Sequence, residues 1–219
     1  MSVSADAARA THQIPAHTRN RSGRPIHMTE VGVAAEVRPN RAPDATSVGM
    51  VVWLSSELMF FAGLFAGWFM VRSEAKVFPP PGVHLPVGRT AIATAVLLAS
   101  SATIHVAVGA AKRSDRVSAV RWLIVTALLG MVFLAFQAYE YATAEFHIDT
   151  NAYGSMFYLL TGFHGLHVLG GVLFLLATAG IIVGRSRAPA GRTVEIAAYY
   201  WHFVDAVWVA MFLTVYVVS

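Results

Sequence analysis

Cysteine is absent from this sequence of 219 residues, and charged residues are scarce, at 13% of the total. Without cysteine the chain cannot form a disulfide framework or a cysteine-ligated zinc or iron–sulfur site. A soluble domain of average composition carries about twice this fraction of charged residues. The chain is instead 56% apolar, with a mean hydropathy of +0.58, and this balance indicates a membrane protein.

The apolar residues are gathered into five long runs in the part of the chain after residue 47. A transmembrane helix needs about 20 predominantly apolar residues, and each run is long enough. We therefore predict an all-α, polytopic transmembrane helix bundle, in which the fourth and longest helix tilts or projects beyond the membrane. The five predicted spans lie near residues 48–71, 90–111, 120–145, 153–183 and 194–218.

Residues 1–47 have a different composition, rich in alanine, arginine, proline, serine and threonine, with no long apolar run. Such a segment cannot bury enough apolar surface to fold alone. We predict a polar, extended N-terminal arm, followed by a membrane domain over residues 48–219. The arginines of the arm could contact anionic lipid or an acidic partner, or the arm could be a solvated tail.

The loops between the predicted spans differ in basic charge. Lysine and arginine near transmembrane helices favour the cytoplasmic side. If the N-terminus is inside, nine basic residues lie on the inner side and three on the outer side, so we predict a cytoplasmic N-terminus and an external C-terminus. The inner residues are Arg38, Arg41, Lys112, Arg113, Arg116, Arg121, Arg185, Arg187 and Arg192, and the outer ones are Arg72, Lys76 and Arg89.

Several ionisable residues lie within the predicted spans, where a charged group costs about 3 kcal/mol or more at the bilayer centre. Glu57 lies roughly 15 Å into the first span, and we expect it to be protonated because desolvation favours the neutral carboxyl group. A chain keeps this many polar groups only if they face protein, water or lipid headgroups, so we predict an internal polar network or lipid contacts. The other members are His105, Glu140, His164, His167, Glu195, His202 and Asp205.

The spacing of these residues favours an inward face. Glu195, His202 and Asp205 fall on one stripe of the last helix, and His164 and His167 are three residues apart. The two histidines of the fourth span could share a metal ion completed by His202, or a haem could bind between facing histidines. No Glu-x-x-His pattern accompanies them, and hydrogen bonding between helices is the more common role of such residues. We therefore predict no metal site and no cofactor site in this chain.

Small and aromatic residues predict how the helices pack. Gly63 and Gly67 form a small-xxx-small pair, which we expect to let two helices approach closely. We interpret the aromatic residues of the first and last spans as lipid-facing or interfacial packing rather than a binding site. They are Trp53, Phe60, Phe61, Trp68, Tyr199, Tyr200 and Trp201.

Intramembrane carboxylates and histidines are also typical of proton relays, so an independent proton-coupled carrier is one interpretation. Against it, the five spans show no inverted repeat, and proline or paired glycines do not break spans in matching halves. A subunit whose polar residues meet a partner or bind lipid fits the sequence better.

Three segments of the chain form recognisable motifs: WLSSELMFFAGLF over residues 53–65, TGFHGLHV over 161–168 and YWHFVDAVW over 200–208. Gln137, Glu140 and Glu195 fall between them at fitting positions. In this order the motifs resemble subunit III of the haem–copper oxidases, in the five-helix form of bacterial, including actinobacterial, cytochrome c oxidases.

This resemblance implies a non-catalytic subunit of an aa3-type cytochrome c oxidase, the proton-pumping terminal enzyme of aerobic respiration that reduces O2 to water. It implies that haem and copper belong to partner subunits, and that this chain packs directly on subunit I, accompanies subunit II, binds phospholipid and supports proton uptake. Glu57 corresponds to the carboxylate for which the family is known to react with a hydrophobic carbodiimide. We further expect a bacterial plasma membrane location and no nucleic-acid partner, and a cytochrome bc-type complex could join the oxidase in a supercomplex.

Two departures from the family pattern are visible. Many members have seven helices, and the first two are missing here. Members with a described lipid site carry an arginine at the inner end of the histidine-bearing helix. This chain has Ile181 at that position. The candidate lipid phosphate contact is therefore Arg185, one turn later. Subunit III of a quinol oxidase, or a homologue associated with a nitric oxide reductase, is the alternative within the family, and the Ser56–Glu57 pair favours the cytochrome c branch.

Overall fold

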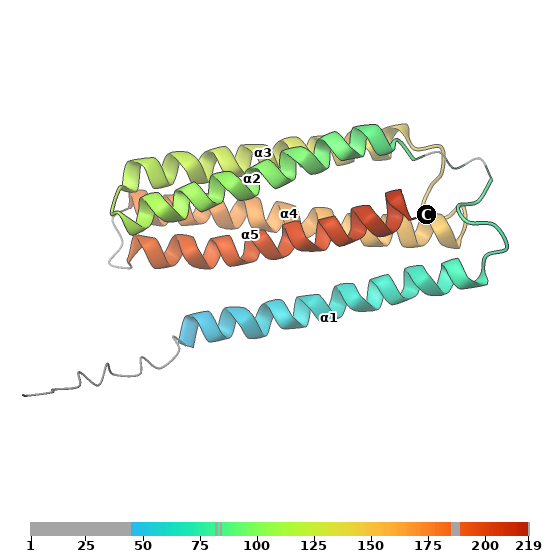
Figure 1. The fold of residues 1–219 in the computed structure, drawn as a ribbon, viewed down its shortest axis with the longest axis horizontal. Coiled ribbons are helices and arrows are strands. Elements are labelled where there is room, and N and C mark those ends of the chain that lie inside the picture. The colour runs from blue at the N-terminus through green and yellow to red at the C-terminus, as the bar shows by residue number, and fades with distance from the viewer. Residues whose placement is uncertain (1–44, 82, 84, 185–188, 219) are drawn as a thin grey trace, which may run out of the picture. The chain divides into compact units, whose positions relative to one another are not determined.

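A computed structural model describes residues 45–81, 83, 85–184 and 189–218 of the chain. These residues form five α-helices and one short π-helix, without a strand among them (Figure 1). The predicted all-α architecture with five membrane-spanning helices is confirmed, since all five helices are long and apolar enough to cross a membrane. The elements are α1 (Ala45–Glu74), α2 (Val87–Lys112), α3 (Arg116–Thr143), α4 (Ala152–Val183), α5 (Ala190–Phe212) and the π-helix η1 (Leu213–Val217).

Each α-helix begins one to four residues before the apolar run that predicted it, whereas α3 ends at Thr143, two residues before the end of its run. The 30 residues of α1 measure about 45 Å along the axis, whereas the hydrocarbon core is about 30 Å thick. Helix ends are set by capping rather than by apolar composition. The Asp115 carboxylate accepts a hydrogen bond from the Ser118 backbone N–H at 3.0 Å and caps α3, and the Asn151 side chain caps α4 in the same way through Gly154. Residues 45–47 of the predicted arm accordingly belong to α1, and the rest of the arm lies outside the described residues.

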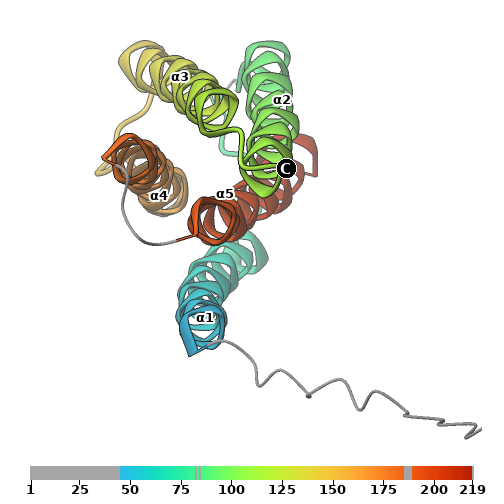
Figure 2. The same cartoon turned by 90° about the vertical axis from the view of Figure 1, so that its left-hand side faces the viewer.

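Helices α2, α3, α4 and α5 form a closed ring of packed neighbours, in which α2 contacts α3 and α5, and α4 contacts the same two helices. Figure 2 shows this ring end-on, with α1 outside it against α4 and α5. Only Met50, Phe61 and Trp68 of α1 are buried. The chain therefore consists of a four-helix bundle and one peripheral helix.

Trp201 of α5 lies at the centre of the bundle and contacts each of the other three helices. Its indole Nε1–H donates to the Ser100 hydroxyl of α2 at 2.8 Å. A Cβ built on Gly130 of α3 would meet the indole at 2.5 Å, and one built on Gly171 of α4 would meet it at 2.9 Å. Only glycine leaves room for the ring at both positions, so these two residues allow α3 and α4 to close on α5.

The predicted close approach at Gly63 is wrong. A Cβ built on Gly63 would have no atom within 4 Å, and one built on Gly67 would meet only the flexible end of Met156. Glycine spacing alone does not show which face of a helix meets a neighbour, and Gly63 lies on a part of α1 that packs loosely. The tight glycine contacts occur inside the ring instead.

The interpretation of the aromatic residues as lipid-facing is correct for only some of them. Trp53, Phe60 and Tyr199 are exposed. Trp68 is fully buried and lies 5.3 Å from the Phe78 ring and 5.2 Å from the Tyr153 ring, measured between centroids. Phe61, Tyr200 and Trp201 are buried as well. The polar atoms of Tyr200 and Trp201 each donate a hydrogen bond inside the chain, which allows these two rings to be buried.

Candidate functional site

Glu57 and His167, two residues singled out in the sequence, lie together near the middle of their helices. The Oε2 atom of Glu57 on α1 is 3.1 Å from Nε2 of His167 on α4. Both side chains are partly buried. The pair is 110 residues apart in sequence, and it joins the peripheral helix to the bundle through a polar contact.

The hydrogen bonds of His167 indicate where the protons of the Glu57–His167 pair lie. Nδ1 of the imidazole lies 2.7 Å from the Phe163 carbonyl oxygen, which can only accept, so Nδ1 carries a proton. Nε2 then either accepts a hydrogen bond from the protonated, neutral Glu57 carboxyl group or donates a hydrogen bond to the Glu57 carboxylate. In both arrangements the pair shares one proton and is electrically neutral in sum, which is the state that a site deep in a bilayer favours.

Aromatic rings close the site around this pair. The Phe61 ring stands edge-on to the His167 imidazole at 4.9 Å between centroids. The Tyr200 hydroxyl donates to the His167 backbone oxygen at 3.0 Å, and the Tyr200 ring stacks on Trp53 of α1 at 5.3 Å. Helices α1, α4 and α5 therefore meet at one polar contact surrounded by aromatic side chains.

His164, which we expected in the polar network, makes no hydrogen bond within the described part of the chain. Its side chain is fully buried, and neither ring nitrogen has a partner there. The imidazole stacks on Trp208 at 4.9 Å and meets the edge of Phe133 at 5.8 Å, both between centroids. His164 and His167 lie three residues apart on α4, but their side chains have different surroundings. The His164 side chain lies in the bundle core among aromatic rings.

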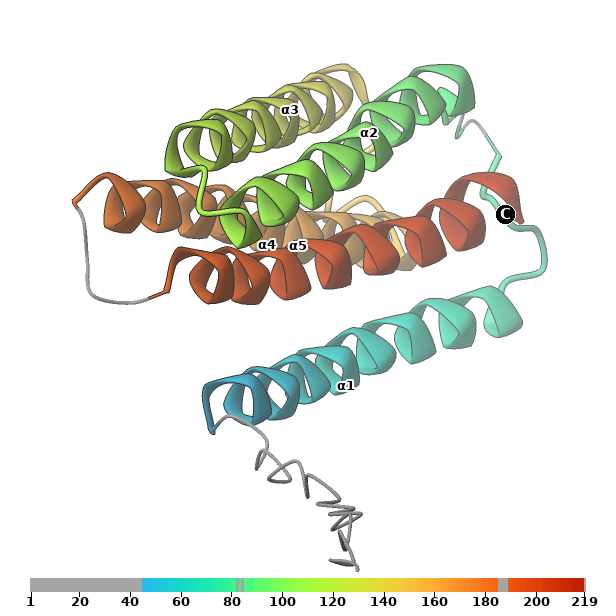
Figure 3. The same ribbon diagram turned by 60° about the vertical axis from the view of Figure 1, so that its left-hand side comes forward.

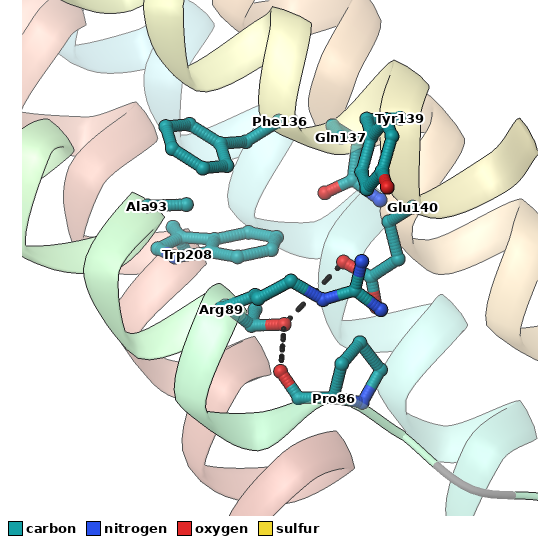
Figure 4. A pocket seen from close by; sticks show the side chains of 9 residues that line it. Pro86, Arg89, Ala93, Phe136, Gln137, Tyr139, Glu140 and Trp208 are labelled. Atoms are coloured by element: carbon teal, nitrogen blue, oxygen red, sulfur yellow. Dashed lines mark hydrogen bonds between the residues drawn. The ribbon is translucent and has the colours of Figure 1, made fainter. Parts of the chain in front are cut away.

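Glu140 lies near the end of α3 and binds two other helices. Its Oε1 accepts a hydrogen bond from the Tyr216 hydroxyl at 2.9 Å, and its Oε2 accepts one from the Thr90 hydroxyl at 3.4 Å. Figure 4 shows the latter bond, together with the second one that joins Thr90 to the Pro86 carbonyl. This carboxylate therefore connects α2, α3 and η1 at one end of the bundle.

A cavity of about 70 Å³ opens beside Glu140. The Arg89 guanidinium lies over the Tyr139 ring at 5.4 Å from the centroid, and both residues line the cavity (Figure 4). Gln137 also lines it, and its buried Nε2 has no hydrogen-bond partner within the described ranges. The site combines a carboxylate, an amide and a guanidinium at the point where three helices end.

A third polar contact joins α2 to α5. The Ser101 hydroxyl donates a short hydrogen bond to Oδ2 of Asp205, and the Ser101 Oγ atom lies 3.1 Å from Nδ1 of His202. Asp205 is buried, as expected. His202, which we expected to face inward with Asp205, is exposed on the surface of the chain, because two residues three positions apart on a helix differ by about 60° in direction.

Glu195 does not belong to the internal network. It lies near the start of α5, and its Oε1 pairs with Nζ of Lys112 at the end of α2 at 3.1 Å, with both side chains substantially exposed. This is an ion pair at the end of the bundle. Of the three residues in the predicted stripe on the last span, only Asp205 is buried in the bundle.

The predicted residues thus form three separate contacts rather than one network, centred on Glu57, Glu140 and Asp205. Arg185 lies outside the described residues. Within the part of the chain that the structure describes, no three His, Asp or Glu side chains are grouped closely enough to hold a metal ion. The sequence did not reveal the neutral partners Ser101, Thr90 and Tyr216, since hydroxyl side chains within apolar helices carry no signal of their own.

The fold and the three contacts define a multi-pass membrane protein whose carboxylates and histidines join its own helices. A family model described as cytochrome c oxidase subunit III matches residues 38–219. The chain belongs to this family and is part of a cytochrome c oxidase complex, so the resemblance seen in the three motifs is confirmed.

Curated relatives with high similarity come from several bacteria. A probable cytochrome c oxidase subunit 3 of Mycobacterium tuberculosis is 46% identical over 192 residues, which cover 84% of this chain and 93% of the relative. Cytochrome c oxidase subunit 3 of Corynebacterium diphtheriae is 42% identical over 194 residues, covering 85% and 93%. The protein of the same name from Thermostichus vulcanus is 37% identical over 183 residues, covering 81% and 89%.

Proposed function

We propose that this chain is the non-catalytic subunit III of an aa3-type, proton-pumping cytochrome c oxidase in a bacterial plasma membrane. In this proposal it stabilises subunit I, accompanies subunit II, binds phospholipid and supports proton uptake. The observation that carries the proposal is the family match over residues 38–219. The names of the bacterial relatives favour cytochrome c over quinol as the electron donor.

The proposed topology places the N-terminus in the cytoplasm and the C-terminus outside. It follows the excess of lysine and arginine on one side of the membrane. The arm over residues 1–47 would then lie on the cytoplasmic side of the membrane domain. A cysteine introduced at position 2 should be labelled by a membrane-impermeant maleimide only after the cells are opened, whereas labelling in intact cells would reverse the topology.

Glu57 has a structural role in this proposal. The neutral Glu57–His167 pair holds α1 on the bundle and is not a step of an obligatory proton or electron path. Glu57→Gln should therefore leave the initial rate of O2 reduction and the proton-pumping ratio close to those of the parent enzyme. Glu74→Gln, at the exposed end of the same helix, is the matched control. Immediate loss of pumping by a fully assembled Glu57→Gln enzyme would contradict the structural role.

The independent carrier is excluded or revived by one further experiment. The purified chain alone, reconstituted into liposomes, should carry no proton flux above that of empty liposomes. Proton flux that disappears in Glu57→Gln would favour the carrier instead.

Phospholipid binding is tested on the purified complex. Arg185 is the candidate phosphate contact by its place in the sequence. Native mass spectrometry should show fewer retained phospholipids after Arg185→Ala than after Arg187→Ala, the neighbouring control. An unchanged lipid count would dismiss the contact.

A further inference from the structure

A polar patch lies on the outer surface of the seam between α2 and α5. We call it the Ser101–His202 patch; it comprises the partly exposed Ser101, the exposed His105 and His202, and the buried Asp205 behind them. Figure 3 shows α2 and α5 as neighbours that lie close together where α2 ends and α5 begins and diverge toward their other ends. The function proposed above leaves this patch without a role.

The patch lies at the depth of the hydrocarbon core. Ser101 is 14 residues from the first residue of α2, or about 21 Å along the axis. His202 is 12 residues from the start of α5, or about 18 Å. Both positions are close to the middle of their helices, where lipid tails cannot hydrogen-bond to a polar group.

The direction of the hydrogen bonds determines what the surface offers to a neighbour. With Asp205 ionised, the single Ser101 hydroxyl proton is donated to Asp205 Oδ2. The contact between Ser101 Oγ and His202 Nδ1 must then be donated by the imidazole. A neutral His202 with its proton on Nδ1 has its lone pair on Nε2, so the patch presents a hydrogen-bond acceptor to whatever covers it.

Small residues flank this acceptor. Ala206 lies one turn after His202 on α5, and Ala102 lies three residues before His105 on α2, and both are exposed. Small side chains let a second helix approach closely, and polar groups between membrane helices are stabilised by hydrogen bonds across the interface. A lipid tail would leave the Nε2 acceptor unsatisfied, whereas a helix with a donor side chain would satisfy it.

We propose that the Ser101–His202 patch is the docking surface for a transmembrane helix of another oxidase subunit, which donates a hydrogen bond to His202 Nε2 from a hydroxyl, amide or indole side chain. This inference rests on the proposed function only in that the chain is a subunit of an oxidase complex.

Site-directed cross-linking in the assembled complex tests the face. The chain has no native cysteine, so Ala102→Cys and Ala206→Cys can each be labelled at one site with a benzophenone maleimide in the membrane. Leu166→Cys is the control, because Leu166 is exposed at a similar depth on α4. We expect adducts between this chain and another subunit of the purified oxidase from the cysteines at positions 102 and 206, and no such adduct from the cysteine at position 166.

Each other outcome overturns the inference. Adducts with lipid alone would show that the patch faces the bilayer, and adducts with the mass of two copies of this chain would show self-association. An equal yield of the subunit adduct at position 166 would remove the specificity for this face. Co-purification of the chain with the oxidase is measured before any cross-linking. If the chain does not co-purify, the proposed function itself fails.

Two substitutions test the polarity of the contact. Leucine at position 202 cannot accept a hydrogen bond, so His202→Leu should speed the loss of this chain from the detergent-purified complex by roughly three- to tenfold, the equivalent of one hydrogen bond between helices. His202→Gln keeps one donor for Ser101 and one acceptor for the partner, and should be retained like the parent chain. Equal retention of all three proteins, or equal loss of both variants, would contradict the proposed acceptor.

Discussion

Helix α1 and the four-helix bundle are held together by different forces. Each bundle helix buries small and aromatic residues against two neighbours, and Trp201 touches the other three helices of the ring. Helix α1 buries three residues and contacts α4 and α5 through one carboxylate–histidine pair and a few rings. Shape complementarity therefore specifies the bundle, whereas a small number of directional contacts specifies the position of α1.

The largest effect is expected inside the ring. Gly130→Ala would place a Cβ 2.5 Å from the Trp201 ring, which also packs against Gly171 of α4. We expect the free energy of unfolding to fall by about 3 kcal/mol, as for overpacked cores. Titration of the purified chain from mild detergent into sodium dodecyl sulfate measures this change.

The control lies on the peripheral helix. Gly63 has open space around its Cα, and alanine is favoured over glycine within a helix by up to about 1 kcal/mol. Gly63→Ala should thus leave the chain as stable as the parent or slightly more so. A comparable loss of stability in both variants would show that α1 packs as tightly as the ring.

A second substitution tests the buried indole of Trp208. Its Nε1–H donates to the Thr94 hydroxyl at 2.9 Å, and its ring stands edge-on to Phe133 at 4.7 Å. Trp208→Phe removes the hydrogen bond and leaves space in the core, so we expect a loss of about 2 kcal/mol in the free energy of unfolding. Trp53→Phe on α1 keeps a ring against Tyr200 and should lower the free energy of unfolding by less than about 1 kcal/mol. The same titration measures both variants. Equal losses would mean that α1 is packed as tightly as the four-helix bundle.

The contact that holds α1 can be measured by a double-mutant cycle. The variants Glu57→Gln, His167→Asn and the double variant should give a coupling free energy of about 1 kcal/mol, the usual size of a polar contact between membrane helices. Unfolding of α1 can be followed by the reactivity of a cysteine introduced at position 50, where Met50 is buried. A coupling of zero would mean that apolar contacts alone place α1.

The smallest effect concerns a helix cap outside the membrane spans. The hydroxyl and backbone N–H of Ser118 donate to the Asp115 carboxylate and lower its pKa. A carboxylate with a lowered folded-state pKa stabilises the fold above its ordinary pKa of about 3.9, and this contribution is lost as the pH falls through the folded-state pKa. The protection factor of the Ser118 amide against hydrogen exchange should accordingly fall as the medium is acidified, relative to a variant with Asp115→Asn, whose cap does not titrate. Parallel pH profiles for the two proteins would refute this assignment.

The sequence was informative wherever a residue type is rare in its setting. Charged residues are rare within apolar runs, and for this reason Glu57, Glu140 and Asp205 were singled out in the sequence. Each of the three makes a contact between helices. Long apolar runs likewise predicted five helices, because a bilayer requires a fixed length of apolar helix.

Side-chain direction was harder to predict. His164 and His167 share one motif, yet one is buried among rings and the other binds Glu57. The hydrophobic residues surround every helix of a membrane protein, so apolar periodicity does not separate the face toward lipid from the face toward protein. For the same reason the tight contact at Gly130 could not be distinguished from the loose one at Gly63 without the packed structure.

In the function proposed here, this chain stabilises an oxidase without taking part in its chemistry. The most direct measurement compares the purified oxidase with a preparation from which this chain has been removed, recording O2 consumption with reduced cytochrome c from the first turnovers until activity ceases. We expect the same initial rate in both preparations and an earlier loss of activity in the depleted one. A depleted enzyme that is inactive from the first turnover, or one that lasts as long as the complete complex, would contradict it.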